Sequence, residues 1–98
     1  MNERLNIDNT FIDEFCINKG IAYLGLFGSF ARNEQTPTSD VDVLIDFDYP
    51  QSLFGLSRIK SALETQFGRP VDLVTRTSLK PTIKPYIEKD IQTLYEKR

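Results

Sequence analysis

The chain reads IAYLGLFGS over residues 21–29 and SDVDVLIDF over residues 39–47, and these two stretches carry most of the information on its fold. The continuous apolar run 21–27 predicts a strand covered on both faces. Residues 40–47 alternate, which predicts a strand with one apolar face and one face of carboxylates. The apolar face holds Val41, Val43, Ile45 and Phe47, and the other face holds Asp40, Asp42, Leu44 and Asp46. We interpret Asp46 as solvated and assign it no role.

A helix is predicted before the first strand, over residues 7–19. Asn9 or Thr10 can cap its start, and Gly20 can end it. Apolar residues near helical spacing indicate the face that it buries. These residues are Phe11, Phe15 and Cys16.

Turn and helix signals connect the remaining strands. Residues 30–34 predict a short helical turn, and Pro37 within residues 35–39 indicates a loop. Ser52 is a plausible cap for a helix that runs to residue 67, where Gly68 stops it. The buried stripe predicted for that helix is Leu56, Ile59, Leu63 and Phe67.

Residues 70–75 predict a third strand. The tail predicts a short helix over residues 79–89, interrupted by Pro81 and Pro85, and a strand over residues 91–95. This order of elements indicates a small sheet with helices packed against it.

Size and composition restrict the classes of function. The 98 residues are enough for one small domain, and 40% hydrophobic with 27% charged residues is an ordinary globular balance. No apolar run is long enough for a membrane span, and the polar start lacks the apolar segment of a secretory signal. With one cysteine, Cys16, no internal disulfide can form, so a reducing cytoplasm is the expected location.

Charge and residue types narrow the choice further. The net charge is −2, with six Lys/Arg against eleven Asp/Glu in residues 1–75, so a strong nucleic-acid-binding face is not indicated. The chain has no histidine, which excludes histidine acid–base catalysis and His-ligated zinc. Any metal must therefore bind oxygen ligands, which favours magnesium, manganese or calcium.

Three carboxylates form the candidate catalytic and metal-binding group. Asp40 and Asp42 lie two residues apart on one strand face, and Asp72 lies on the next predicted strand. Because sequential strands are usually neighbours, we expect these side chains to lie together and to bind one or two magnesium ions. A D-x-D pair by itself is more often just the polar face of an edge strand.

The pair Gly28-Ser29 favours the metal site over that alternative. Glycine lets backbone amides approach an anion closely, and the Ser29 hydroxyl adds a donor. Arg32, one turn later, lies within reach of the same phosphates or of a carboxylate. A phosphate cradle beside a metal site is what phosphoryl transfer requires, so Gly28, Ser29 and Arg32 are the candidate nucleotide-binding residues.

These motifs resemble the signature of DNA polymerase beta-like nucleotidyltransferases. The resemblance rests on GSFAR at 28–32, SDVDVLI at 39–45 and PVDLV at 70–74, and it extends over nearly the whole chain as one minimal nucleotidyltransferase (MNT) domain, 1–98. It implies an α/β fold (α+β in some schemes), with a small mixed sheet flanked by helices. It also implies two Mg²⁺ ions and transfer of a nucleoside monophosphate from ATP or another NTP. Asn33 replaces the glycine that many members have after the arginine, and asparagine tolerates the left-handed backbone.

The resemblance also implies partners. Similar minimal domains act as antitoxins of small helical HEPN-type toxins, and some transfer AMP to a tyrosine of the toxin. Our first hypothesis is such an adenylyltransferase, working in a homo- or hetero-oligomer because 98 residues hold no separate acceptor-binding domain. A silent nucleotide-binding antitoxin that acts by contact is the alternative. Transfer to a small hydroxylated molecule ranks third.

Overall fold

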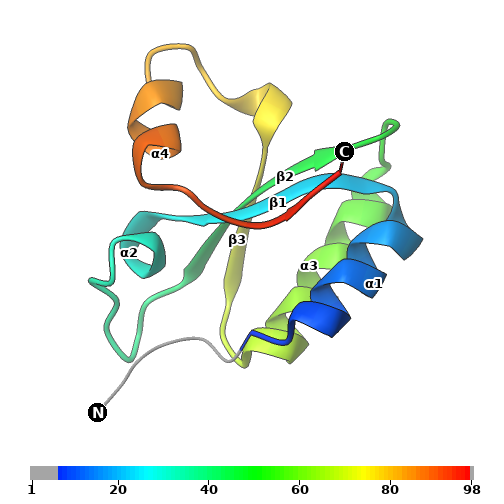
Figure 1. Cartoon of the computed structure of the whole chain (residues 1–98), viewed down its shortest axis with the longest axis horizontal. Coiled ribbons are helices and arrows are strands. Elements are labelled where there is room, and N and C mark those ends of the chain that lie inside the picture. Colours follow the sequence, from blue (N-terminus) through cyan, green and yellow to red (C-terminus); the bar gives the residue numbers. More distant parts are fainter. Residues whose placement is uncertain (1–6, 98) are drawn as a thin grey trace.

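The computed structural model describes residues 7–97, and its centre is a mixed four-stranded sheet in the order β3-β2-β1-β4 (Figure 1). The strands are β1 (Ile21–Phe27), β2 (Val41–Phe47), β3 (Val71–Thr75) and β4 (Gln92–Glu96). The central strand β1 pairs antiparallel with both β2 and β4, whereas β2 and β3 are parallel. The predicted mixed sheet flanked by helices is confirmed.

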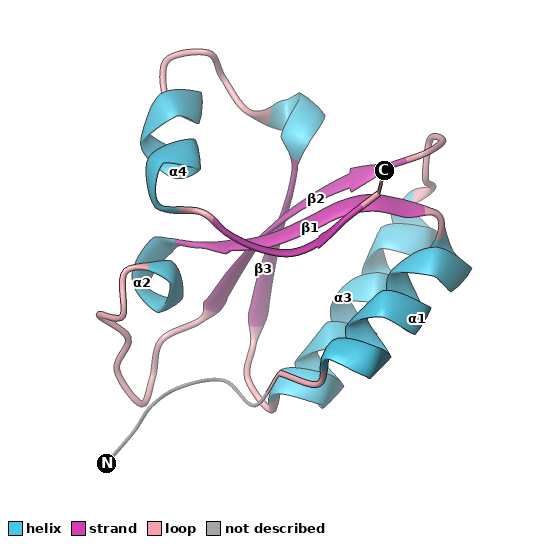
Figure 2. Cartoon of the chain, viewed as in Figure 1, coloured by secondary structure: helices cyan, strands magenta, loops and turns pink. Residues whose placement is uncertain are grey.

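The helices lie on both faces of this sheet. They are α1 (Asn9–Lys19), α2 (Gly28–Ala31), α3 (Leu53–Phe67) and α4 (Lys84–Asp90), with a 3₁₀ turn η1 at Arg76–Ser78. Figure 2 shows α1 and α3 side by side on one face, while α4 lies on the other side with the tail that leads into β4. The helix α3 connects the parallel strands β2 and β3, as a parallel pair requires.

The main core lies between the sheet and the pair α1 and α3. It contains the apolar face of β2 together with buried residues of both helices. Burial raises the pKa of the Cys16 thiol to about 12, and the nearby charge of Asp13 adds to the rise. Cys16 is therefore an inert core residue, as its place in the helical pattern predicts.

The start of α1 differs from the prediction. The helix begins at Asn9, and its cap is Asp8, whose carboxylate accepts a hydrogen bond from Phe11 N–H, rather than Asn9 or Thr10. Ile12 is fully buried between the predicted core positions, while Phe11 is half-buried and stacks on Phe15. Three adjacent polar residues can all cap, and the packing of Ile12 selects the register.

Other helix boundaries also need correction. The short helix after β1 is Gly28–Ala31 rather than residues 30–34, so it starts directly at the glycine. Pro85 does not interrupt α4, because it lies in the first turn, where its missing N–H leaves no hydrogen bond unmade. The cap at Ser52 and the end at Gly68 are confirmed for α3. Ile59, Leu63 and Phe67 of its stripe are buried, and Leu56 is half-buried.

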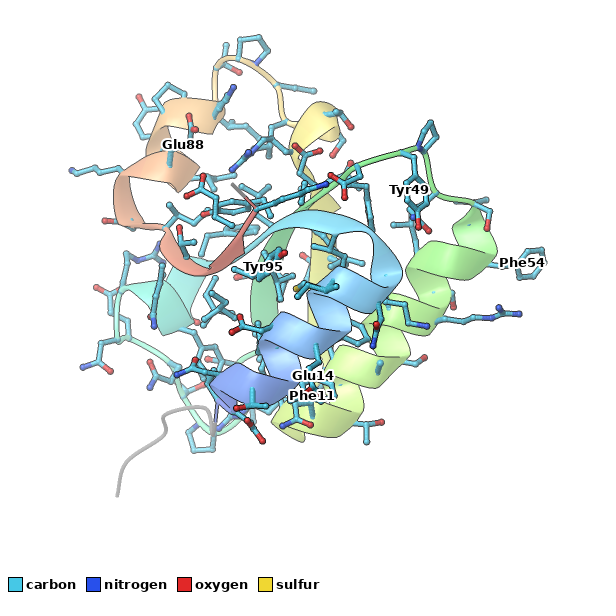
Figure 3. All side chains as sticks on the ribbon, turned by 45° about the vertical axis from the view of Figure 1, so that its right-hand side comes forward. Phe11, Glu14, Tyr49, Phe54, Glu88 and Tyr95 are labelled. Atoms are coloured by element: carbon cyan, nitrogen blue, oxygen red, sulfur yellow. The ribbon has the colours of Figure 1, made fainter. Side chains whose placement is uncertain are left out.

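Large apolar side chains remain exposed at the start of α3. Leu53 is 84% and Phe54 80% exposed, and Figure 3 shows Phe54 extending away from the body of the molecule. Tyr49, in the turn before the helix, is also exposed. Among the described residues, no helix is long and apolar enough to cross a membrane.

Candidate active site

The three candidate carboxylates come from the beginnings of two neighbouring strands. Asp42 and Asp72 are register partners in the parallel pair β2–β3, so their side chains project from the same face of the sheet. Asp40 directly precedes β2 and lies two residues before Asp42, on the same side. The prediction that these strands lie side by side is confirmed. Asp42 is half-buried, whereas Asp40 and Asp72 are exposed.

The electrostatic surroundings of Asp42 include the charges of both other acids. Its pKa is raised above the ordinary value, first by burial, then by the negative charges of Asp72 and Asp40. The positive charge of Arg32 opposes this rise. A carboxylate that is partly desolvated and faces two like charges gains stability from a cation or a proton.

Gly28, directly after β1, lies beside the Asp42 carboxylate of this acidic patch. It has a left-handed backbone, with φ of 71°, and a Cβ atom at this position would collide with the Asp42 carboxylate. Only glycine therefore lets the chain turn from β1 into α2 directly beside Asp42. Ser29 follows it and is half-buried in the first turn of α2.

Arg32 lies at the end of α2 and is exposed. Its Nε donates to the Glu34 carboxylate at 3.0 Å, so its ion pair is with a neighbour in sequence rather than with the three aspartates. Asn33 has φ of 59°, which fits the expectation that asparagine replaces glycine in a left-handed position here. A surface ion pair of this kind is weak, so Arg32 can exchange Glu34 for a phosphate.

One residue that positions the site was missed in the sequence. Arg69 donates through Nη1 to three backbone carbonyls of the loop before β2: Thr36 at 3.0 Å, Pro37 at 3.3 Å and Ser39 at 3.1 Å. Its guanidinium also lies 5.0 Å from the centre of the Phe30 ring. Arg69 thereby ties the loop that carries Asp40 to the start of β3. Its separation of about thirty residues from that loop leaves no local signal for this contact.

The same face of the sheet carries a second polar group further along β2. Asp46 is not simply solvated, since its carboxylate lies 3.8 Å from the Arg76 guanidinium. Arg76 lies 4.0 Å over the ring of Tyr23, whose hydroxyl forms a 2.7 Å hydrogen bond with Thr93 of β4. These contacts connect η1 and β4 to the central strands. They explain Asp46 as a structural residue.

The donor atoms of the candidate set are oxygens, the kind of ligand that hard divalent cations prefer. All three groups are carboxylates, and magnesium prefers oxygen ligands while it keeps several waters and phosphate oxygens. Within residues 7–97 no group of three or more Asp, Glu, Cys or His side chains lies close enough together to hold a metal ion. An open set of carboxylates suits magnesium, which completes its coordination with substrate rather than with protein alone.

Comparison with known proteins decides the family. The family model described as "Nucleotidyltransferase domain" matches residues 9–94 of this chain. The chain belongs to the nucleotidyltransferase domain family. The domain is accordingly a nucleotidyltransferase enzyme, and the resemblance read from its motifs is confirmed.

Two curated relatives carry a more specific name. A protein of Methanocaldococcus jannaschii, provisionally named a protein adenylyltransferase, is 42% identical over 71 residues, which cover 72% of this nucleotidyltransferase domain and 76% of the relative. The protein adenylyltransferase MntA of Thermococcus cleftensis is 38% identical over 72 residues, which cover 74% of the domain and 73% of the relative.

Solved structures share the fold. A structure provisionally described as a minimal nucleotidyltransferase superposes with a TM-score of 0.74 at 30% identity, over 86% of each chain. A toxin–antitoxin crystal structure with AMP-PNP gives 0.76 at 17% identity, over 94% of this domain and 76% of that chain. A tri-AMPylated Shewanella oneidensis HEPN toxin in complex with MNT antitoxin gives 0.65 at 16% identity, over 90% and 69%. The last two likenesses show the fold alone.

Proposed function

We propose that this nucleotidyltransferase transfers AMP from ATP to a hydroxyl group of a HEPN-type partner protein, with a tyrosine as the acceptor, and thereby acts as an antitoxin. The observation that carries the proposal is the pairing of Asp42 with Asp72 on one sheet face, beside Gly28 at the end of β1. Relatives named as protein adenylyltransferases, and the shared fold with an MNT antitoxin bound to an AMPylated toxin, support the choice of nucleotide and partner.

Each candidate residue has a role in this proposal. Gly28 and Ser29 bind the triphosphate through backbone amides and the hydroxyl, and Arg32 adds a positive charge. Asp40 and Asp42 would hold two magnesium ions, with Asp72 as a further ligand. When bound, magnesium supplies charge neutralisation on the phosphates and lowers the pKa of the acceptor hydroxyl. Asp72, exposed on β3, accepts the acceptor's proton.

A partner surface is available on the same molecule. Leu53 and Phe54 are almost fully exposed in the first turn of α3. Apolar side chains of this size are costly to leave in water and are typical of a contact with another protein. We assign them to the contact with the HEPN-type partner.

Label transfer tests the proposal. The domain, purified together with its HEPN-type partner, is incubated with magnesium and ATP labelled at the α-phosphate. We expect label on the partner, lost in Asp40→Asn and in Asp42→Asn. Asp46→Asn is the matched control, because Asp46 lies on the same face of β2 but pairs with Arg76. A partner that binds and stays unlabelled with every NTP would show that the catalytic proposal is wrong and favour the contact-only antitoxin.

A further inference from the structure

The strand β3 forms one edge of the sheet and directs alternate peptide groups away from it. The Pro70 carbonyl, just before the strand, accepts from Val41 N–H at 2.9 Å, which starts the pairing with β2. The next N–H, that of Val71, instead donates to the Glu64 carboxylate on α3 at 2.9 Å. Because backbone groups alternate along a strand, residues 71, 73 and 75 face the open edge.

Side chains close both ends of this edge. The Glu64 carboxylate accepts a hydrogen bond from Val71 N–H, and the Ser78 hydroxyl donates one to the Thr75 carbonyl at 2.8 Å. Between these two closed ends, Leu73 directs its N–H and C=O outward. Natural proteins usually block edge strands, so an edge blocked at its ends and open in the middle indicates a binding position with a defined register.

A groove follows the open part of the edge. A hollow of about 230 Å³ lies between β3 and α3. Its lining residues are Leu56, Ser57, Lys60, Asp72, Leu73 and Thr75. A larger hollow of about 410 Å³ adjoins it at the far end of β3 and shares Leu56 and Thr75. The two hollows therefore run from the turn after β2 along α3 to the position of Asp72, whose side chain projects to the other face of the sheet.

We propose that the acceptor polypeptide binds as an added strand on this edge, hydrogen-bonded to the backbone of Leu73. The inference rests on the proposed function in one respect, that the acceptor is a polypeptide. The peptide residue opposite Leu73 points into the hollow between β3 and α3, and the residue next to it points to the face that carries Asp72. That neighbour is the hydroxyl residue that accepts AMP.

The spacing of strands brings this hydroxyl to the acids. Adjacent strands lie about 4.8 Å apart, so the acceptor side chain lies beside Asp72 and one strand further from Asp42. Its oxygen attacks the α-phosphorus of ATP, the bond from that phosphorus to the pyrophosphate oxygen breaks, and pyrophosphate leaves. The hydroxyl proton passes to the Asp72 carboxylate. One phosphate ester is made for each phosphoanhydride bond broken.

Lys60 defines the preferred sequence beside the acceptor. It lines the hollow that receives the neighbouring side chain. Among the described residues that line this hollow, Asp72 is the one carboxylate, and its side chain projects to the opposite face. An acidic side chain opposite Leu73 complements the Lys60 ammonium. We therefore expect acceptors in which an acidic residue directly adjoins the tyrosine.

A peptide array tests this docking. Short peptides carry one tyrosine flanked by glutamate, alanine or lysine, and are incubated with the domain, magnesium and ATP labelled at the α-phosphate. Leu73→Pro and Leu73→Ala are compared, because both lose the leucine side chain and only proline removes the outward N–H. Proline removes one hydrogen bond to the added strand and also hinders its approach, so we expect about tenfold less label with Leu73→Pro than with Leu73→Ala.

Further outcomes separate the two proposals. Glutamate-flanked peptides should take more label than lysine-flanked ones, and Lys60→Glu should reverse this order. Equal labelling by the two Leu73 variants overturns the docking while leaving the transfer intact. A domain that labels the folded partner but no peptide also overturns it, whereas a domain that binds no nucleotide overturns both. If Leu73→Pro unfolds, Ser57→Trp fills the hollow from α3, with Ser57→Ala as its control.

Discussion

Arg69 connects the start of β3 to the loop that carries Asp40, and its removal should weaken both the fold and the site. In Arg69→Met the aliphatic stem remains, while the hydrogen bonds to three loop carbonyls and the contact with Phe30 are lost. A hydrogen bond from a charged donor contributes about 1.5–3 kcal/mol, but one nitrogen with two hydrogens serves three carbonyls. We therefore expect about 2–3 kcal/mol in total, including about 0.5–1 kcal/mol from the ring contact.

This loss can be measured in two ways. For a domain of this size, it lowers Tm by about 8–15 °C. The loop must also be ordered again when nucleotide binds, and fixing the backbone of one residue costs about 1–2 kcal/mol, so the Kd for magnesium–ATP should rise about five- to thirtyfold. Thermal melts followed by circular dichroism, and calorimetric titration well below Tm, measure these effects.

The control is Arg58→Met, since Arg58 is exposed on α3 and the substitution is chemically the same. We expect its Tm and its magnesium–ATP affinity to match those of the unaltered chain. Equal effects at Arg58 and Arg69 would refute the reasoning. A lower Tm with unchanged affinity would refute the link between Arg69 and the position of Asp40.

Three further predictions concern the acids, the glycine beside them and the exposed start of α3. The raised pKa of Asp42 means that the folded chain binds its proton more tightly than the unfolded chain, so this group destabilises the metal-free fold increasingly as pH rises through that pKa. Asp42→Asn should therefore raise Tm at neutral pH and leave Tm unchanged below pH 3.8. The same substitution should abolish magnesium–ATP binding. A lower Tm at neutral pH would contradict this reasoning. Gly28→Ala and Gly68→Ala both place alanine in a left-handed backbone, which costs about 1–2 kcal/mol in urea unfolding. Only Gly28→Ala also meets the Asp42 carboxylate, so it should lose more stability than Gly68→Ala and should lose magnesium–ATP binding. Phe54→Glu should leave Tm within about 2 °C, because a change at an exposed side chain is usually within 0.5 kcal/mol, and should abolish co-purification of the HEPN-type partner.

Much of the fold could be read from local patterns. The alternation over residues 40–47 predicts the observed strand within one residue, because the period of two is a property of the backbone itself. Ser52 and Gly68 define α3 because their cap interactions involve only neighbours in sequence. The side-by-side placement of the strands with Asp40 and Asp72 follows from a short connection through one helix.

The tertiary structure decided what depends on residues far apart in the chain. The contact of Arg69 with the loop before β2, and the pairing of Asp46 with Arg76, join segments whose separation no periodicity records. The open edge at Leu73 is likewise invisible in sequence, because it depends on which strand occupies each side of β3. Local chemistry therefore determined which residues could form the site. Packing determined which of them are held in place by distant residues, and which edge of the sheet stays open.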